Sequence, residues 1–267
     1  MKFRWVYFLI SGLAIVISIY AISVWRFKLG IDFTGGSIVE YKLEKGSEVK
    51  TVEEKFGPDF TQEKASEFVQ SVEQNESGSK TTLLRYETVG PVLSKELLQK
   101  TYVAIALASF VILAWIAYQF KSLQFGISAI LATLHDTIIL LGTFAILGHF
   151  KGVEIDILFV TALLTVLSFS VHDTIVVYDR IRELSRKSGG ASLQEIANYA
   201  LTTTMVRSIN NSLTIAFMLT ALFLMGGETI KWFVFALLVG TISGTYSSPF
   251  VAVPLLVAWE ESKKLRN

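Results

Sequence analysis

The segment LLTVLSFSVHDTIVVYDRIRE, residues 163–183, is apolar enough for a membrane and yet carries His172 and Asp173 near its middle. A bilayer core of about 30 Å needs roughly 20 apolar residues in a helix to span it. The apolar run around this segment extends from about 157 to 178 and therefore predicts a transmembrane helix. Because a carboxylate at that depth costs roughly 2.5 to 3.5 kcal/mol, we expect it to have a structural or functional partner.

The composition extends this prediction to the whole chain. Its 267 residues are 52% hydrophobic and 18% charged, with a mean hydropathy of +0.51. These values are typical of a polytopic membrane protein and exclude a soluble globule. A net charge of +1 offers no basic field for nucleic acid, which is not expected as a partner. The absence of cysteine excludes disulfides, thiolate zinc sites, iron–sulfur clusters and cysteine nucleophiles.

Six apolar segments are long enough to span a bilayer, and we expect them at about 5–25, 101–120, 123–150, 157–178, 202–227 and 232–259. The first has Trp5 and Trp25 at its ends, where interfacial aromatic residues are common. It is too long for the core of a cleaved signal peptide and is interpreted as an uncleaved anchor. Pro249 and Pro254 predict kinks in the sixth segment.

Lysine and arginine are distributed unevenly over the loops. One side of the expected membrane holds most of them, at positions 2, 4, 121, 180, 182, 186, 187, 263, 264 and 266, whereas the opposite short loops hold Lys151 and Lys231. The positive-inside rule then predicts that both termini are cytoplasmic. The expected organisation is a first transmembrane helix (1–26), an extracytoplasmic domain (27–99), a five-helix bundle (100–259) and a cytoplasmic tail (260–267).

The extracytoplasmic segment 27–99 is expected to be one small α+β domain. Alternating residues predict strands over 37–43 and 80–90, and a helix is expected around 62–72. The stretch 44–80 shows no clear second strand. Gly35 and Gly36 favour a tight turn, because the spacing and the Lys-Ser/Thr pair of a phosphate loop are missing.

Two carboxylates lie inside expected spans, and each belongs to the tetrapeptide His-Asp-Thr-Ile: Asp136 at 135–138 and Asp173 at 172–175. Arg207, in the fifth span, is the expected partner of Asp173, because helix length places both in the cytoplasmic half. Helical spacing adds further polar residues to this helix; the supporting polar set is His135, His172, Thr174, Asn210 and Asn211.

Two interpretations of these charges remain open. In the first, Asp173 and Arg207 form a buried structural ion pair while His135 and His172 satisfy backbone or serine groups. In the second, they form a proton path, because burial opposes the ionised carboxylate while a nearby arginine favours it. Protonation of Asp173 would then release Arg207 and change the packing of the helices.

The remaining signals concern packing and the absence of familiar catalytic motifs. Gly240, Gly244 and Ser247 form a line of small residues on the sixth helix, which favours close helix packing within the chain or with a partner subunit. No metal-ligand cluster, nucleophile elbow or nucleotide motif is present in the sequence. We therefore expect neither an enzyme nor a bound cofactor or metal.

Six stretches carry a family resemblance: FKLGIDFTGGSIVEYKL (27–43), ETVGPVLSKEL (87–97), LHDTIILLG (134–142), VHDTIVVYDRIRE (171–183), RSINNSLT (207–214) and GTISGTYSSPFVAVPLL (240–256). In order and spacing they resemble the SecD/SecF family of the bacterial protein translocase. The resemblance covers nearly the whole chain, and the length with one short outer domain fits the SecF branch.

This resemblance implies an all-α half-unit of the resistance-nodulation-division (RND) type with six transmembrane helices, and a ferredoxin-like outer domain or a reduced form of it. It implies a location in the bacterial plasma membrane and association with SecD, the SecYEG channel, YajC and the SecA pathway. The family uses the proton motive force to help preproteins finish crossing the membrane. By position, Asp173, Arg207 and Asp136 match its proton-relay residues, although His172 stands where the family usually has asparagine.

Two alternative functions remain beside a proton-driven export subunit. One is a scaffold that stabilises the translocase without conducting protons, and the other is an independent proton-coupled exporter of the RND type. The coupling ion, proton or sodium, is open, because a carboxylate serves either.

Overall fold

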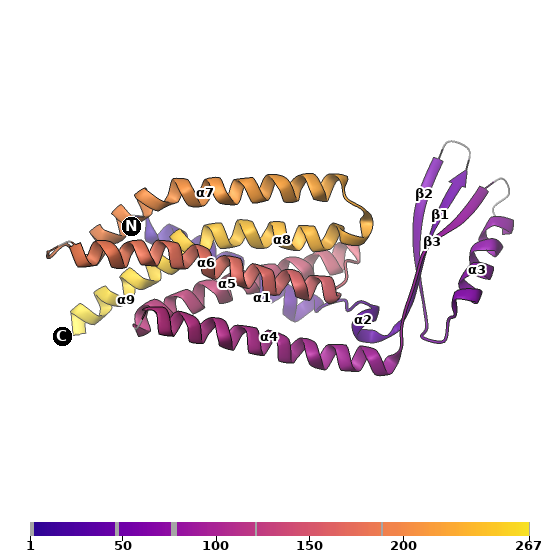
Figure 1. Ribbon diagram of the computed structural model, residues 1–267, viewed down its shortest axis with the longest axis horizontal. Coiled ribbons are helices and arrows are strands. Elements are labelled where there is room, and N and C mark those ends of the chain that lie inside the picture. Colours follow the sequence, from indigo (N-terminus) through magenta and orange to yellow (C-terminus); the bar gives the residue numbers. More distant parts are fainter. Residues whose placement is uncertain (1–2, 46–47, 76–78, 121, 188, 267) are drawn as a thin grey trace. The chain divides into compact units, whose positions relative to one another are not determined.

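The computed structural model describes residues 3–45, 48–75, 79–120, 122–187 and 189–266 (Figure 1). Lys2, Lys121 and part of the stretch 44–80 lie outside the described residues. The chain divides into two compact units, one formed by 1–28 with 105–267 and the other by 29–104. Six helical segments among the described residues are long and apolar enough to cross a membrane, which confirms the polytopic fold expected from the sequence.

The membrane helices are α1 (Arg4–Trp25), α4 (Pro91–Phe120), α5 (Leu123–Lys151), α6 (Ile157–Lys187), α7 (Leu193–Met225) and a last span made of α8 (Glu228–Ser247), η1 (Ser248–Ala252) and α9 (Val253–Arg266). Several helices extend past the expected apolar runs, because hydropathy marks only the part of a helix inside the bilayer. At the start of α7, Ser192 and Glu195 form a capping box that begins the helix before its apolar part.

The last span changes its helical form at the expected kink. Residues 248–252 form a π-helical turn that contains Pro249 and ends two residues before Pro254, consistent with the missing N–H of proline interrupting the regular ladder. The hydroxyl of Tyr178 lies 3.0 Å from the carbonyl oxygen of Ala252 and 2.7 Å from Oγ of Ser128. A buried side chain of α6 therefore ties this turn to α5.

The helices of the bundle differ in how much of their surface the chain itself covers. In α6 and in the last span 56% of the apolar window is buried, whereas in α4 and α7 only 11% is. The N-terminal helix α1 packs closely against α5. A Cβ on Gly142 of α5 would come within 2.3 Å of Ser18 of α1. An ion pair of 2.5 Å between Arg4 and Glu261 brings the two ends of the chain together, as expected for six spans.

The unit 29–104 contains the short helix α2 (Ile31–Thr34), strands β1 (Gly36–Lys45), β2 (Glu48–Phe56) and β3 (Ser79–Val89), and helix α3 (Gln62–Asn75). The strands form an antiparallel sheet in the order β2-β1-β3. Its core joins Val39 and Tyr41 of β1 to Ala65 and Val69 of α3. In its described residues the sheet has three strands, packed against α3, which is fewer than the four strands and two helices of the ferredoxin-like unit that the resemblance implies.

Strand β2 corrects the sequence interpretation, which found no clear strand between 44 and 80. Its residues, EVKTVEEKF, are largely charged, and an exposed edge strand tolerates charges that hide the usual alternation. The tight turn before β1 is present: Gly35 and Gly36 have φ of 76° and 136°. A Cβ on Gly36 would lie 2.9 Å from the carbonyl oxygen of Phe56, so glycine is required there.

Candidate functional site

Asp136 of α5 lies in a closed cluster of hydrogen-bond donors and is 1% exposed. Its Oδ2 accepts hydrogen bonds from the hydroxyls of Ser170 (2.5 Å) and Ser247 (2.6 Å). Its Oδ1 accepts one from Ser243 (2.6 Å) and lies 3.0 Å from Nδ1 of His135. Each oxygen thus has two hydrogen-bonding neighbours, three of them serine hydroxyls and the fourth an imidazole nitrogen.

This cluster joins three helices, since the serines come from α6 and α8. Small residues bring those two helices together: a Cβ on Gly240 would lie 2.1 Å from a methyl carbon of Val166, and one on Gly244 would lie 3.3 Å from Ser170. Ser247, the third residue of the small-residue line, donates directly to Asp136. The line therefore serves both close packing and the binding of a charge.

Asp173 of α6 has a much sparser environment, although it is only 6% exposed. The hydroxyl of Ser208, on α7, lies 2.6 Å from its Oδ1 and 2.8 Å from its Oδ2. The hydroxyl of Ser248, which lies 2.9 Å from Oγ1 of Thr174, is a second hydroxyl beside the carboxylate. Asp173 thus touches α7 through one shared hydroxyl.

Arg207 does not form the expected ion pair with Asp173: among the described residues, no salt bridge joins them. Successive residues of a helix point about 100° apart, and Ser208 instead of Arg207 faces α6 at this level. The guanidinium of Arg207 lies in a polar groove with Asp179 and Arg180. Ser208 therefore occupies the position beside Asp173 that the sequence-based prediction assigned to Arg207.

The supporting polar residues separate into two groups. His172, Asn210 and Asn211 are exposed on the outside of the bundle. His135 is buried beside Asp136, and its Nε2 has no hydrogen-bond partner in the described part of the chain. The two histidines of the repeated tetrapeptide therefore lie in opposite environments.

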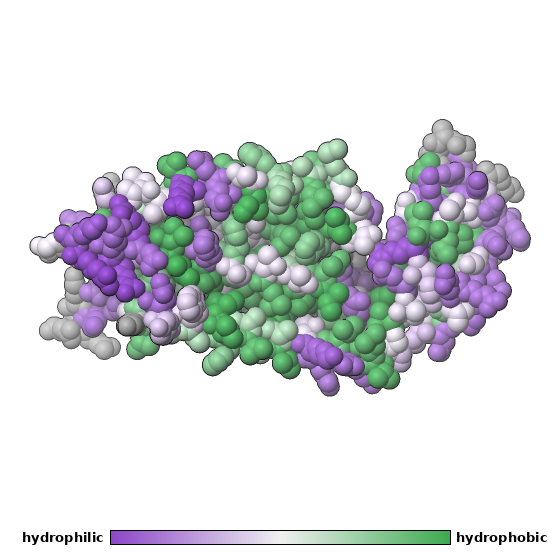
Figure 2. Space-filling model, viewed as in Figure 1, coloured by the Kyte–Doolittle hydropathy of each residue, from purple (hydrophilic) through white to green (hydrophobic). Residues whose placement is uncertain are grey.

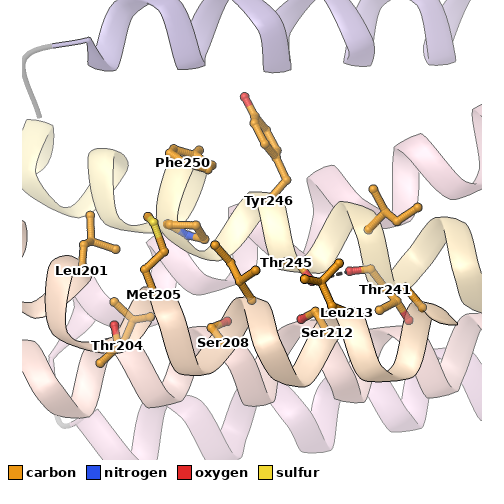
Figure 3. Close-up of a pocket in the computed structure, with 15 residues that line it drawn as sticks. Leu201, Thr204, Met205, Ser208, Ser212, Leu213, Thr241, Thr245, Tyr246 and Phe250 are labelled. Carbon is orange, nitrogen blue, oxygen red and sulfur yellow. Dashed lines mark hydrogen bonds between the residues drawn. The ribbon is translucent and has the colours of Figure 1, made fainter. Parts of the chain in front are cut away.

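A cavity of about 300 Å³ lies between α7 and α8, next to Ser208. Figure 3 shows Thr204, Ser208 and Ser212 in a row along α7. The buried hydroxyl of Ser212 has no partner among the described residues. Ser208 lines this cavity and donates to Asp173, so its hydroxyl links the carboxylate to the cavity.

Sequence reasoning missed the serines that bind both carboxylates: Ser170, Ser208 and Ser243. Their signal is weak, because hydroxyl residues are common in membrane helices and usually bond to their own backbone. The useful clue is spacing, since Ser243 and Ser247 stand one helical turn apart and face the same way. In the described part of the chain, no group of three histidine, aspartate or glutamate side chains is placed to hold a metal ion.

Comparison with known proteins gives relatives over nearly the whole chain. The family model for the C-terminal part of the protein export membrane proteins SecD and SecF matches residues 69–262, and the SecD/SecF GG motif matches 21–46. The SecF translocase subunit of Thermobaculum terrenum is 41% identical, with 99% of this chain and 95% of that protein covered. The corresponding subunit of Synechocystis is 33% identical, with 97% and 93% covered.

A solved structure has the same fold. The crystal structure of SecDF from Thermus thermophilus, described as a translocon-associated membrane protein, matches with a TM-score of 0.84 and 29% identity. The match covers 98% of this chain and 39% of that one, so this chain spans about two fifths of the SecDF chain. Its sequence, its fold and these matches establish that the chain belongs to the SecD/SecF family of protein export membrane proteins.

Proposed function

We propose that the chain is an accessory subunit of the Sec protein translocase, which works with SecD and uses the proton motive force to help preproteins finish crossing the membrane. The observation that carries this proposal is Asp173, a carboxylate inside a membrane span that meets α7 through a single hydroxyl. A charge in lipid is seldom kept without a functional or structural reason. No covalent chemistry on a substrate is required.

In this proposal, Asp173 exchanges the proton and α7 responds to it. An ionised carboxylate accepts from Ser208, whereas a protonated carboxyl group brings a donor of its own to the same contact. The contact must then rearrange, and α7 is free to move because the chain buries little of it. Arg207, adjacent to Ser208, would shift with the helix, so that the charge change is converted into motion.

Asp136 is given a different part from the proton-relay role that the resemblance implies. Its two oxygens already accept from three hydroxyls and lie beside an imidazole nitrogen, and replacing the carboxylate would leave several buried groups poorly paired. We propose that it anchors α5, α6 and α8 as the frame against which α7 moves.

The outward face of α7 supports association with a second membrane bundle. Arg207, Asn210 and Asn211 are exposed on α7, as is His172 on α6, and polar side chains in lipid are costly unless another helix covers them. SecD is the proposed partner, with SecYEG and YajC in the wider assembly and SecA delivering the preprotein. We propose a bacterial plasma membrane location with both termini cytoplasmic, based on the distribution of lysine and arginine.

The test uses cells in which this chain is the only SecF-type subunit. Asp173→Asn keeps the size of the side chain but cannot titrate, so export of a secreted protein is expected to fall to the level of cells lacking the subunit. Glu228→Gln, at the start of α8, is the control and should leave export unchanged. Membrane levels of the unaltered chain and of the two variants must be equal. Export measured with a sodium gradient in place of the proton gradient would identify the coupling ion.

A second candidate is the non-conducting scaffold. The closed cluster around Asp136 favours it, because a buried charge with all its hydrogen bonds made stabilises a fold without exchanging protons. Unchanged export with Asp173→Asn at equal membrane levels would establish the scaffold and refute the proton-coupled role.

A further inference from the structure

A polar groove of about 710 Å³ lies where the end of α6 meets α7. Its wall is formed by side chains that are mostly charged, namely Val176, Asp179, Arg180, Arg182, Glu183, Arg186, Lys187, Thr204 and Arg207. Five of these are cations and two are carboxylates, so the groove has an excess of positive charge. Figure 2 shows strongly hydrophilic residues gathered at this end of the bundle, beside the apolar surface of the spans.

The carboxylates within reach do not neutralise this excess. Glu183 binds both Arg180 and Lys187, at 2.7 Å each, and Arg182 donates to the backbone carbonyl of Gln119 at 3.0 Å. Arg186 and Arg207 have no carboxylate partner in the described part of the chain. Within the described groove, Arg182, Arg186 and Arg207 therefore have no carboxylate partner, and Asp179, the other carboxylate of the groove, leaves a net positive charge there.

The groove lies at the boundary of the apolar region. Val176 and Thr204 line its deeper part, and the charged residues of α6 from Asp179 to Lys187 continue from there past the apolar run. Lipid headgroups lie at this depth on either face of a membrane. A ligand here would therefore meet cations at one end and apolar helix surface at the other.

We propose that this groove binds the headgroup phosphate of an anionic phospholipid of the phosphatidylglycerol type. A guanidinium group can donate two parallel hydrogen bonds to two oxygens of one phosphate, and it keeps its charge at all physiological pH values. Basic pockets between membrane helices are recurrent sites for anionic headgroups. The acyl chains would lie along the apolar surface beside Val176, which a free phosphate ion cannot use. This inference does not depend on the proton-coupled role.

The test measures lipid binding to the purified full-length chain by native mass spectrometry. Phosphatidylglycerol and phosphatidylcholine with the same acyl chains are the two probes. Wild type should retain phosphatidylglycerol preferentially. The double variant Arg186→Gln, Arg207→Gln should bind it about tenfold more weakly, equivalent to about 1.4 kcal/mol. Lys231→Gln, at the start of α8, removes a charge outside the groove and should bind as wild type does.

Four results would overturn the proposal. Equal binding of the two lipids would mean that the acyl chains alone are recognised. Unchanged binding by the double variant, in a chain with the same thermal unfolding midpoint, would place the lipid elsewhere. Displacement of the lipid by millimolar inorganic phosphate would indicate a site for soluble anions. Expulsion of the lipid by the partner bundle, with the double variant impaired in assembly, would make the groove a subunit contact.

Discussion

The tetrapeptide His-Asp-Thr-Ile occurs twice in this chain, and its two copies have opposite surroundings. At 135–138, three serine hydroxyls from α6 and α8 and a buried histidine surround Asp136. At 172–175, the histidine faces outward, and Asp173 has the hydroxyl of Ser208, from α7, and that of Ser248, from η1, beside it. The first carboxylate joins helices that bury much of their surface, and the second joins a helix that buries little.

The difference teaches that the number and origin of hydrogen-bond donors separate a structural charge from a mobile one. A carboxylate held by donors from three helices resists any change, because each unpaired donor adds a cost of about 1 to 3 kcal/mol. A carboxylate with fewer donors, such as Asp173 with Ser208 and Ser248, can change partners at smaller cost. On this basis Asp136 belongs to the frame of the bundle and Asp173 to its moving part.

The largest expected effect is on stability, and it comes from Asp136→Asn. The amide places an N–H group where Oδ1 or Oδ2 accepts hydroxyl donors, so the serine cluster has to rearrange. We expect the free energy of unfolding to fall by about 3 kcal/mol, read as a lower thermal unfolding midpoint of the purified chain. The matched variant Asp173→Asn should lower it far less, and equal losses would remove the distinction between the two sites.

A smaller effect is expected from Ser208→Ala, which removes the only hydroxyl that donates to Asp173 from α7. A hydrogen bond to a charged group contributes about 1.5 kcal/mol, so the thermal midpoint should fall modestly while export falls clearly. Ser208→Thr retains the hydroxyl and should restore export. A variant with normal export would show that α7 senses Asp173 through some other group.

The sequence predicted the parts of the fold that depend on composition and periodicity. The six spans follow from hydropathy, and the strands around 37–43 and 80–90 follow from alternation and correspond to β1 and β3. Strand β2 was not predicted, because lysine and glutamate obscure the alternation of its apolar residues. The C-terminal part of α6, beyond residue 178, was not predicted, because a helix that continues past the membrane has no apolar signal there.

The candidate site was predicted less completely, since it depends on rotation about helix axes. Distance along the helix correctly placed residues 207 and 208 at the depth of Asp173 in the bundle. It could not predict which of these two consecutive residues faces α6, and the structure shows that Ser208 does. The serines around Asp136 come from segments far apart in sequence, and only the packing of α5, α6 and α8 brings them together. Local pattern carries no information about such contacts.

The smallest expected effect concerns a third carboxylate bound by a hydroxyl, this time in water. Glu73 of α3 accepts hydrogen bonds from the hydroxyl (2.8 Å) and backbone N–H (3.1 Å) of Thr81, and these bonds hold the pKa of its side chain below the ordinary 4.5. The lowered pKa contributes stability that is present above pH 4.5 and lost as the pH falls through the lowered value.

This stabilisation is small because Glu73 is fully exposed, so the sensitive measurement is an NMR titration of the Glu73 carboxyl carbon in the full-length chain. Its midpoint should lie below 4.5 and should rise in Thr81→Val, which removes the hydroxyl but retains the backbone donor. An unchanged midpoint in that variant would mean that the backbone bond alone is responsible. If the hydroxyl does lower the pKa of Glu73, a hydroxyl donor has a small effect on an exposed carboxylate. The larger effect expected of the serine hydroxyls at Asp136 then comes from burial.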